Sequence, residues 1–167
     1  MKEWQQLIQI MELRLQQALF YQQEIADPHC SYEDELRILD FVWRGIYQNI
    51  EQVLQHSPTR GRIGTMSEDE YQQKMYEFIT WTTMVTRFAI EGGLETESAY
   101  TLSDLYIQQA DTTKNLVVLE QLRHQMTWHF AYKVSQKQNA GNGYSKPVSK
   151  AVDHLINHLY QTIQSRQ

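Results

Sequence analysis

The chain has 167 residues, of which 41% are hydrophobic and 21% charged, with seven Gly, three Pro and one Cys. This composition excludes a disordered chain, a turn-rich all-β protein and a disulfide framework. The net charge of −5 differs from that of a strongly basic nucleic-acid-binding protein, although residues 133–167 alone carry five Lys or Arg against one Asp.

Apolar residues three and four positions apart predict helices along nearly the whole chain. The first helix is expected at residues 3–25, with a stripe formed by Trp4, Leu7, Ile8, Met11, Leu15, Ala18, Leu19 and Ile25. It should end before Asp27-Pro28, because a residue that precedes proline disfavours the helical conformation.

A second helical run follows at residues 31–54, with Ser31 as the N-cap and a break or bend at Gly45. After a loop at 57–65, Ser67 and Glu70 have the spacing of a capping box. The helix that follows should stop at Gly92-Gly93 in a Schellman-type cap, with Leu94 as its apolar contact.

The remaining segments are expected to be a short helix at 95–100, a helix capped by Thr101 that ends near 109, and a long helix at 116–138. The interpretation is an all-α helical bundle of about seven helices, with a C-terminal helix after a flexible linker. A helical domain would span 1–138, the linker 139–143, and a further helix would begin in 144–167.

No residue pattern predicts catalysis, a metal or a cofactor. His154 and His158 share a helix face, but no third ligand is evident. Cys30 has no basic neighbour in sequence that would activate a thiol. The chain also lacks a Gly-rich phosphate loop and a nucleophile motif, so we expect a protein that is not an enzyme.

Several aromatic residues fall on or near the apolar stripes, among them Trp43, Phe78, Trp81, Phe88 and Trp128. Core packing is the simpler interpretation. The alternative is an aromatic pocket or a helix-face interface, because such residues dominate both kinds of site.

Two segments carry a resemblance. The segment Thr86-Arg87-Phe88-Ala89-Ile90-Glu91-Gly92-Gly93-Leu94, followed by Leu102-Ser103-Asp104-Leu105-Tyr106-Ile107, resembles a segment of AraC-family transcriptional regulators of Gram-positive bacteria. In those regulators it lies in the helical region before the DNA-binding domain. The motif residues would be Arg87, Glu91, Gly92, Gly93, Ser103, Asp104 and Tyr106.

The C-terminal segment is similar to the first helix of that family's DNA-binding domain, with Tyr144, Ser145, Lys146 and Lys150 at its start. The family's two helix-turn-helix units need about a hundred residues, and they are missing from this chain. The resemblance covers roughly residues 27–160.

The resemblance implies a cytoplasmic regulatory domain that dimerises or receives a small-molecule or peptide signal, and that reaches DNA only through the missing C-terminal domain. From the residues alone, Arg87 and Glu91 could pair, and Thr101 or Ser103 could cap a helix with Asp104 in its first turn. We expect a homodimer formed through an amphipathic helix and no membrane contact. A small-molecule or peptide sensor and a stand-alone helical adaptor that binds another protein remain alternatives.

Overall fold

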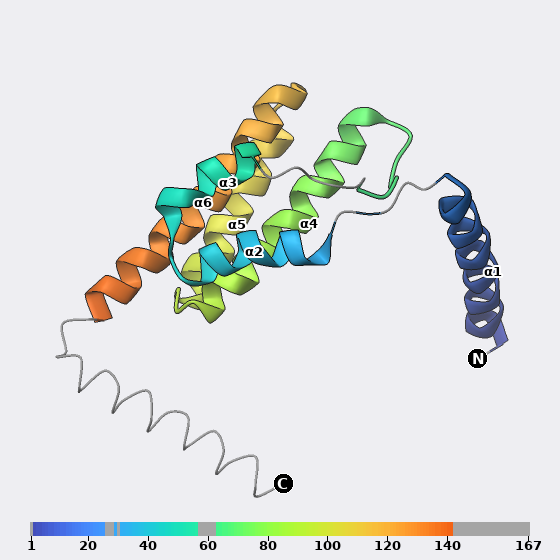
Figure 1. The fold of residues 1–167 in the computed structure, drawn as a ribbon, viewed down its shortest axis with the longest axis horizontal. Helices are drawn as coiled ribbons and strands as arrows, with labels where there is room; N and C mark the ends of the chain where they lie inside the picture. The colour runs from blue at the N-terminus through green and yellow to red at the C-terminus, as the bar shows by residue number, and fades with distance from the viewer. Residues whose placement is uncertain (1, 26–28, 30, 57–62, 142–167) are drawn as a thin grey trace, which may run out of the picture.

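The computed structural model describes residues 2–25, 29, 31–56 and 63–141 (Figure 1). The helices are α1 (Lys2–Ile25), α2 (Tyr32–Trp43), α3 (Ile50–His56), α4 (Glu70–Glu91), α5 (Thr96–Asp111) and α6 (Leu116–Gly141), with a 3-10 helix, η1 (Tyr47–Asn49), before α3. No β-strand occurs within these residues, which confirms the all-α fold. The helix predicted in 144–167, with Tyr144, Ser145, Lys146 and Lys150, lies outside the described residues.

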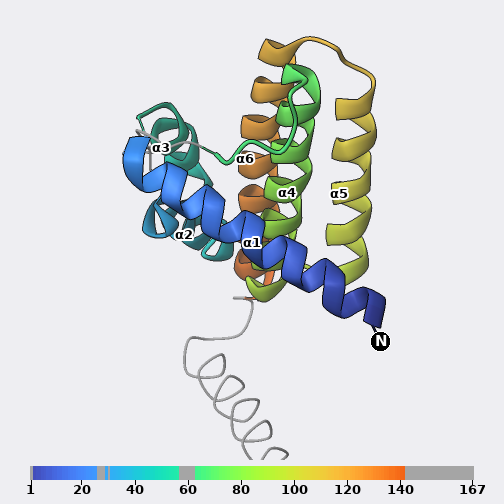
Figure 2. The same ribbon diagram turned by 90° about the vertical axis from the view of Figure 1, so that its right-hand side faces the viewer.

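Helix α4 is at the centre of the bundle. It packs most extensively on α6, with α5 along its other side and α2 across both α4 and α6. Figure 2 shows α4, α5 and α6 running side by side, while η1 and α3 lie against α6. The core among these helices is apolar and includes Leu39, Val42, Val85, Ala89, Met126, Phe130, Ala131 and Val134.

The buried threonines of α4 and α6 are hydrogen-bonded. Trp81 of α4 donates its indole N–H to Thr127 Oγ1 of α6 at 2.9 Å, and Thr127 donates to the Arg123 carbonyl at 2.8 Å. Thr82 and Thr86 donate to carbonyls one turn earlier in α4, each at 2.7 Å. Hydroxyls that bond back to the helix can be buried without leaving an unsatisfied polar group.

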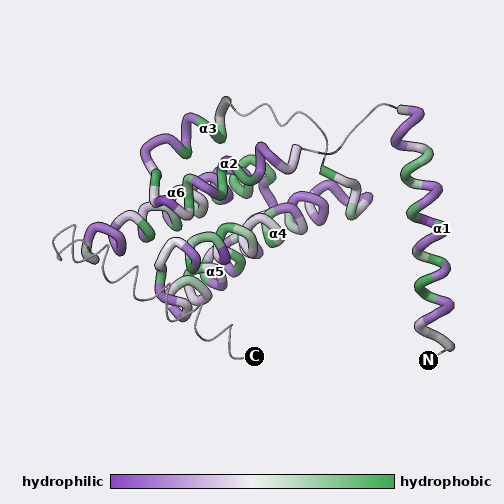
Figure 3. Tube along the Cα trace, turned by 60° about the horizontal axis from the view of Figure 1, so that its bottom comes forward, coloured by the Kyte–Doolittle hydropathy of each residue, from purple (hydrophilic) through white to green (hydrophobic). Residues whose placement is uncertain are grey.

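Helix α1 stands apart from the bundle, as Figures 1 and 3 show. It forms no extended packing with another described element. Figure 3 shows apolar residues recurring along its length, and the large ones are exposed: Trp4, Leu7, Ile8, Ile10, Met11, Leu13, Leu15, Leu19, Phe20 and Tyr21. None of the described helices has the length and apolar content that crossing a bilayer requires.

The predicted break at Gly45 is confirmed. Gly45 has φ +67°, and the chain turns there from α2 into η1. Ser31 is the N-cap of α2, as predicted, but its hydroxyl donates to the Glu33 carboxylate and accepts no hydrogen bond from the helix backbone.

Two predicted helix starts are wrong. Asp69, not Ser67, caps α4, because its carboxylate accepts from Gln72 N at 2.8 Å. Residues 95–111 contain one helix where two were predicted, since Glu95 caps α5 by accepting from the backbone N–H groups of Glu97 and Ser98. The predicted capping residues Thr101 and Ser103, and Asp104 with them, therefore lie within α5.

The long C-terminal helix continues beyond its predicted end at Gln138. Helix α6 includes residues 139–141, which were assigned to the linker. Asn139 and Ala140 are compatible with a helix, and the Asn139 side chain donates to Ser135 Oγ at 3.4 Å one turn earlier. The division into two domains stays a prediction.

Candidate functional site

The C-terminal ends of α2, α4 and α6 meet at one end of the bundle. We call this place the α2–α4–α6 junction. Its residues are Trp43, Gly45, Glu91, Gly92, Val134, Ser135 and Gln138. Because α6 leads directly toward residues 142–167, the junction holds the last described turns of the chain.

Gly92 allows α2 and α4 to approach closely. A Cβ atom at this position would lie 2.5 Å from the Trp43 carbonyl oxygen and 2.9 Å from Val134 Cγ1. Gly92 has an ordinary helical φ of −72°, so its role is steric and not conformational. Gly93 differs, because it has φ +99° and open space around it.

The turn after α4 is a Schellman motif, as predicted. Leu94 N donates to the Ala89 carbonyl at 3.0 Å and Gly93 N to the Ile90 carbonyl at 2.9 Å. This is the pattern in which the residue with positive φ follows the helix C-cap.

Gln138 joins all three helices. Its Nε2 donates to the Trp43 carbonyl at 3.2 Å and to the Gly92 carbonyl at 3.1 Å. The last carbonyls of a helix have no partner within the helix, so the glutamine satisfies a group at the end of both α2 and α4. Trp43 adds a direct link between these two ends, because its indole N–H donates to the Glu91 carbonyl at 3.2 Å.

Gly45 brings the turn after α2 onto α6. A Cβ at Gly45 would lie 2.6 Å from Ser135 N and 2.7 Å from Ser135 Cα. Both the positive φ and this backbone approach require glycine. The junction therefore contains two contacts, at Gly45 and Gly92, that only a residue without a side chain permits.

A groove lies on the exposed face of α6, between α5 and α3. It has a volume of about 890 Å³ and is lined by Glu51, Tyr106, Gln121, His124, Gln125, Trp128, His129 and Tyr132. We call it the α6 groove. Two other hollows, of about 440 and 630 Å³, lie toward the C-terminal end of α6 and are both lined by Leu94, Ser98 and Lys133.

Aromatic rings form one side of the α6 groove. Trp128 and Tyr132 are stacked with ring centroids 5.1 Å apart, and Tyr47 of η1 packs edge-on against both. In this arrangement Trp128 is 38% exposed.

A tyrosine–histidine pair forms the other side. Tyr106 Oη and His129 Nδ1 are hydrogen-bonded at 3.0 Å. Burial raises the pKa of the Tyr106 phenol and lowers the pKa of the His129 imidazole, which the charge of Lys133 lowers further. Burial and Arg123 also lower the pKa of His124, against the opposing effect of Glu120. Both imidazoles are therefore neutral at pH 7.

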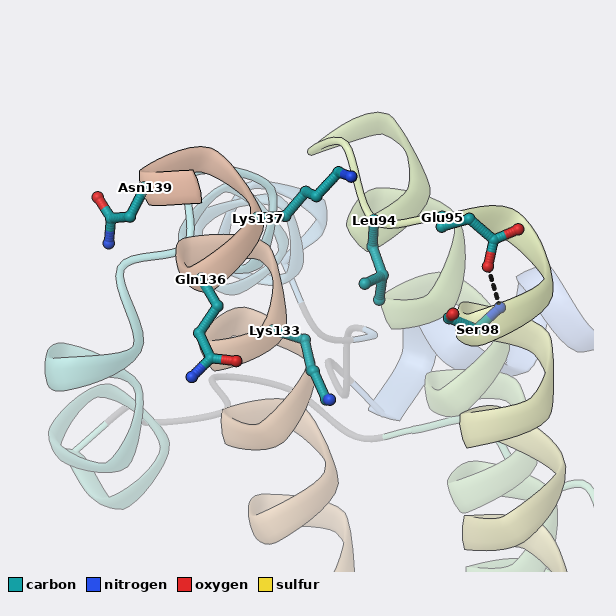
Figure 4. A pocket seen from close by; sticks show the side chains of 7 residues that line it. All are labelled: Leu94, Glu95, Ser98, Lys133, Gln136, Lys137 and Asn139. Atoms are coloured by element: carbon teal, nitrogen blue, oxygen red, sulfur yellow. Dashed lines mark hydrogen bonds between the residues drawn. The ribbon is translucent and has the colours of Figure 1, made fainter. Parts of the chain in front are cut away.

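The hollow of about 630 Å³ near the C-terminal end of α6 is shown in Figure 4. Lys133, Gln136, Lys137 and Asn139 project from α6 on one side, and Leu94, Glu95 and Ser98 lie on the other. The Glu95 carboxylate accepts two backbone N–H groups at the start of α5. A hydrogen bond from the Ser98 side chain, together with these backbone N–H groups of Ser98 and Glu97, lowers the pKa of Glu95. Glu95 is thus engaged as a helix cap.

The motif residues have structural partners. Arg87 donates to the Tyr100 hydroxyl and lies 5.0 Å from the centre of its ring, so it contacts α5 and not Glu91 as predicted. Tyr106 lines the α6 groove, and Glu91 and Gly92 belong to the junction. The structure thus brings Glu91 and Gly92 together with Trp43 but separates them from Ser103 and Asp104.

The five aromatic residues predicted to form a pocket or interface do not share one site. Phe78 and Trp81 are buried in the core, and Phe88 packs against it. Trp43 lies at the junction and Trp128 in the α6 groove, each partly exposed. Core packing accounts for three of the five.

Sequence reasoning did not identify Gln138 or His129 as site residues. Gln138 is one of 21 glutamines, and its spacing does not distinguish it from those on polar helix faces. His129 and Tyr106 are 23 residues apart and meet only through the packing of α5 on α6. Within residues 2–25, 29, 31–56 and 63–141, no group of three or more His, Cys, Asp or Glu side chains could hold a metal ion.

No protein-family model, curated protein or solved structure matches the chain.

Proposed function

We propose that this chain is the regulatory domain of an AraC-like bacterial transcription regulator. In this role the bundle self-associates or receives a signal, and α6 carries its state to a DNA-binding domain that begins near Tyr144. The motifs at residues 86–94 and 102–107 support the family assignment by resemblance, and two features of the structure support the role.

The α2–α4–α6 junction is the observation that carries the proposal. Gln138 ties the last turns of α6 to the ends of α2 and α4, and α6 is the helix that leads into the C-terminal segment. A shift of α2 or α4 would move the Trp43 or Gly92 carbonyl and break a hydrogen bond to Gln138. The C-terminal end of α6 would then change its direction or lose helical order. A connection of this kind is what a relay between two domains needs.

The exposed apolar side chains of α1 support self-association. Ten large apolar side chains between Trp4 and Tyr21 are exposed on α1. Large exposed apolar patches are rare in monomeric proteins and mark interaction sites. Dimeric helix-turn-helix proteins bind paired half-sites, so self-association suits a regulator.

Small-molecule or peptide sensing is a second candidate function. The α6 groove favours it, because aromatic rings and the polar pair Tyr106–His129 converge on a hollow of the size of a ligand pocket. A thermal-shift screen of metabolites and short peptides would test it: stabilisation of the wild-type chain but not of a Trp128→Ala variant supports sensing.

The coding sequence downstream of Gln167 provides the first test of the main proposal. We expect an open frame with two helix-turn-helix units. A stop codon directly after Gln167 would contradict the relay and favour the stand-alone adaptor.

Transcription from a promoter bound by the full regulator provides the second test. Gln138→Leu should change promoter output, because it removes both bonds at the junction. Gln136→Leu is the matched control, since among the described residues Gln136 donates to Tyr132 of its own helix. Equal output from the two variants would count against the relay.

A further inference from the structure

We infer that the α6 groove binds a small organic cation, an ammonium group carried on an apolar body. The ammonium group lies against the exposed part of the Trp128 indole, on the side of the groove where Glu51 supplies a carboxylate. This inference deepens the sensing function proposed above and rests on it for its biological role. It depends neither on a DNA-binding domain nor on α1.

The aromatic cluster leaves one face of the Trp128 indole uncovered by other rings. Tyr132 stacks on the opposite face, with ring planes 10° and centroids 5.1 Å apart. Tyr47 lies beside this stack, because its ring is nearly perpendicular to both rings and its centroid is 5.5 Å from Trp128 and 5.2 Å from Tyr132. The exposed surface of Trp128 is therefore its rim and the face away from Tyr132. Among aromatic side chains, the face of an indole attracts a cation most strongly.

The described side chains that line the α6 groove carry one formal charge at pH 7, and it is negative. Glu51 contributes this charge from the first turn of α3. The other lining residues are two neutral histidines, two glutamines, two tyrosines and Trp128. The charge of Glu51 acts on the His124 imidazole and opposes the lowering of its pKa, so the carboxylate lies near that part of the groove. A carboxylate and an aromatic face are together suited to an ammonium group.

Arg123 adjoins the groove residue His124, but its charge is balanced by a carboxylate. Its Nε donates to both oxygens of Glu120 at 3.2 Å, and its guanidinium lies 5.9 Å from the centre of the Trp81 ring. Two opposite charges in contact largely cancel at a distance. The sign of the charge in the groove is therefore set by Glu51.

Lys133 gives the α6 groove a direction. It lines the two neighbouring hollows and not the groove itself, and Figure 4 shows it in one of them. Its charge lowers the pKa of His129, so the positive potential is felt at the His129 end of the groove. The ammonium group accordingly lies toward Glu51, and the apolar body extends toward Tyr106 and His129.

The groove also disfavours the ligands that compete with a cation. Its volume of about 890 Å³ is within the range of about 300–1,000 Å³ of small-molecule pockets, so size alone admits many compounds. An anion placed there would meet the Glu51 carboxylate and the negative face of the Trp128 ring. Repulsion of the wrong charge adds to the attraction of the right one in setting specificity.

Titration of the isotope-labelled full-length chain with three probes of similar body tests the inference. Phenethylamine, phenethyl alcohol and phenylacetate carry a positive, a neutral and a negative head group at pH 7. The indole N–H resonance of Trp128, assigned by its absence in Trp128→Phe, reports binding, and those of Trp4 and Trp43 are references. The amine should shift the Trp128 resonance saturably with a Kd about threefold to tenfold below that of the alcohol, and phenylacetate should bind most weakly.

Glu51→Gln separates the effect of charge from that of shape. It should raise the Kd of phenethylamine about threefold or more and leave the Kd of phenethyl alcohol unchanged, because only the charge is removed. Glu12→Gln is the matched control, since it makes the same change of charge on α1, away from the groove lining, and it should change neither Kd. Circular dichroism, together with the Kd of the alcohol, establishes that each variant is folded.

The outcomes separate this inference from the proposed function. If the amine binds no more tightly than the alcohol, or if phenylacetate binds most tightly, the cation is wrong and a sensing pocket for another ligand is left. The absence of a saturable shift with any probe up to about 20 mM would overturn the ligand site itself. Equal effects of Glu51→Gln and Glu12→Gln would overturn the part assigned to Glu51. None of these results bears on the relay, which the reading frame after Gln167 and the Gln138→Leu assay test separately.

Discussion

The glycines at and after the end of α4 are required for two different reasons, one steric and one conformational. Gly92 has a helical backbone that any residue could adopt, yet its α-carbon faces the Trp43 carbonyl across a distance that excludes a methyl group. Gly93 is needed for its positive φ and has no neighbour within reach. Two adjacent glycines are thus required for different physical reasons: Gly92 for the space that it leaves to Trp43, and Gly93 for its positive φ.

Gly92→Ala should destabilise the chain by about 1–3 kcal/mol, because α2 and α4 must separate to admit the methyl group. Gly93→Asn should cost less, since asparagine tolerates positive φ and this position is open. Urea denaturation followed by circular dichroism measures both. A loss for Gly92→Ala no larger than that for Gly93→Asn would contradict the close approach.

Protonation of the groove histidines should destabilise the fold. The pKa values of His124 and His129 lie below the ordinary value of 6.5 in the folded chain, so the unfolded chain binds more protons in that range. The free energy of unfolding should therefore fall as the pH drops through about 6.5, and level off below the folded pKa values.

Urea denaturation between pH 7.5 and about pH 5 measures this dependence, over the range where an unperturbed histidine titrates. His129→Gln and His124→Gln should each make the dependence shallower, and the double variant shallower still. An unchanged dependence in the double variant would show that other groups control it.

At the scale of the elements, the α4–α6 pair contains the most specific contact in the core. The Trp81 indole N–H is buried and has its partner in Thr127 on the facing helix. Thr127 in turn bonds within α6, so the hydroxyl is used both as donor and as acceptor.

Thr127→Val should cost about 1–3 kcal/mol of unfolding free energy, because the shape is kept while the buried indole N–H loses its partner. Thr83→Val is the matched control: Thr83 also bonds one turn back in its helix, but it lies on the exposed face of α4. The two free energies of unfolding should differ clearly in thermal or urea denaturation. Equal losses would mean that the contact between the helices adds nothing.

The helices were largely predictable from the sequence, and the site was predictable only in part. The period of apolar residues identified α1, α2, α4 and α6, and Gly45 and Gly92-Gly93 indicated where helices end. The predicted helix start at Thr101 is wrong, because α5 begins at Thr96 with Glu95 as its N-cap, and Thr101 lies inside the helix. A threonine at a position suited to a cap can also lie inside a helix.

The contacts that form the site depend on how helices pack, which periodicity does not specify. Gln138 bonds to Trp43, which is 95 residues earlier, and Tyr106 meets His129 between helices. For both, the local sequence predicts only a polar or half-buried helix position. The apolar face of α1 was visible in the sequence, but that it lies apart from the bundle was not.

At the scale of the whole molecule, the described chain consists of a packed bundle and a helix outside it. None of the buried core residues comes from α1, so the bundle does not depend on α1 for its core. The stability of the bundle is therefore separable from the proposed association through α1.

Deleting residues 1–28 should leave the bundle folded, with little change in Tm at low protein concentration. The full chain should show a Tm that rises with protein concentration, because association stabilises the folded state, and the shortened chain should not. Thermal denaturation over a range of concentrations measures this difference. Loss of helical signal beyond that of α1 itself would show that the bundle needs α1.

The acceptors of Gln138 at the junction are main-chain oxygens, and this has a consequence for how mutations would act there. Substitutions at position 43 change the indole but cannot delete its carbonyl, so that bond tolerates sequence drift on the α2 side. Replacing Gln138 by a residue without a side-chain donor, in contrast, removes both bonds at once. The connection is mutationally robust at its carbonyl acceptors and vulnerable at Gln138, so variants that separate the end of α6 from α2 and α4 without unfolding the bundle should concentrate at this one position.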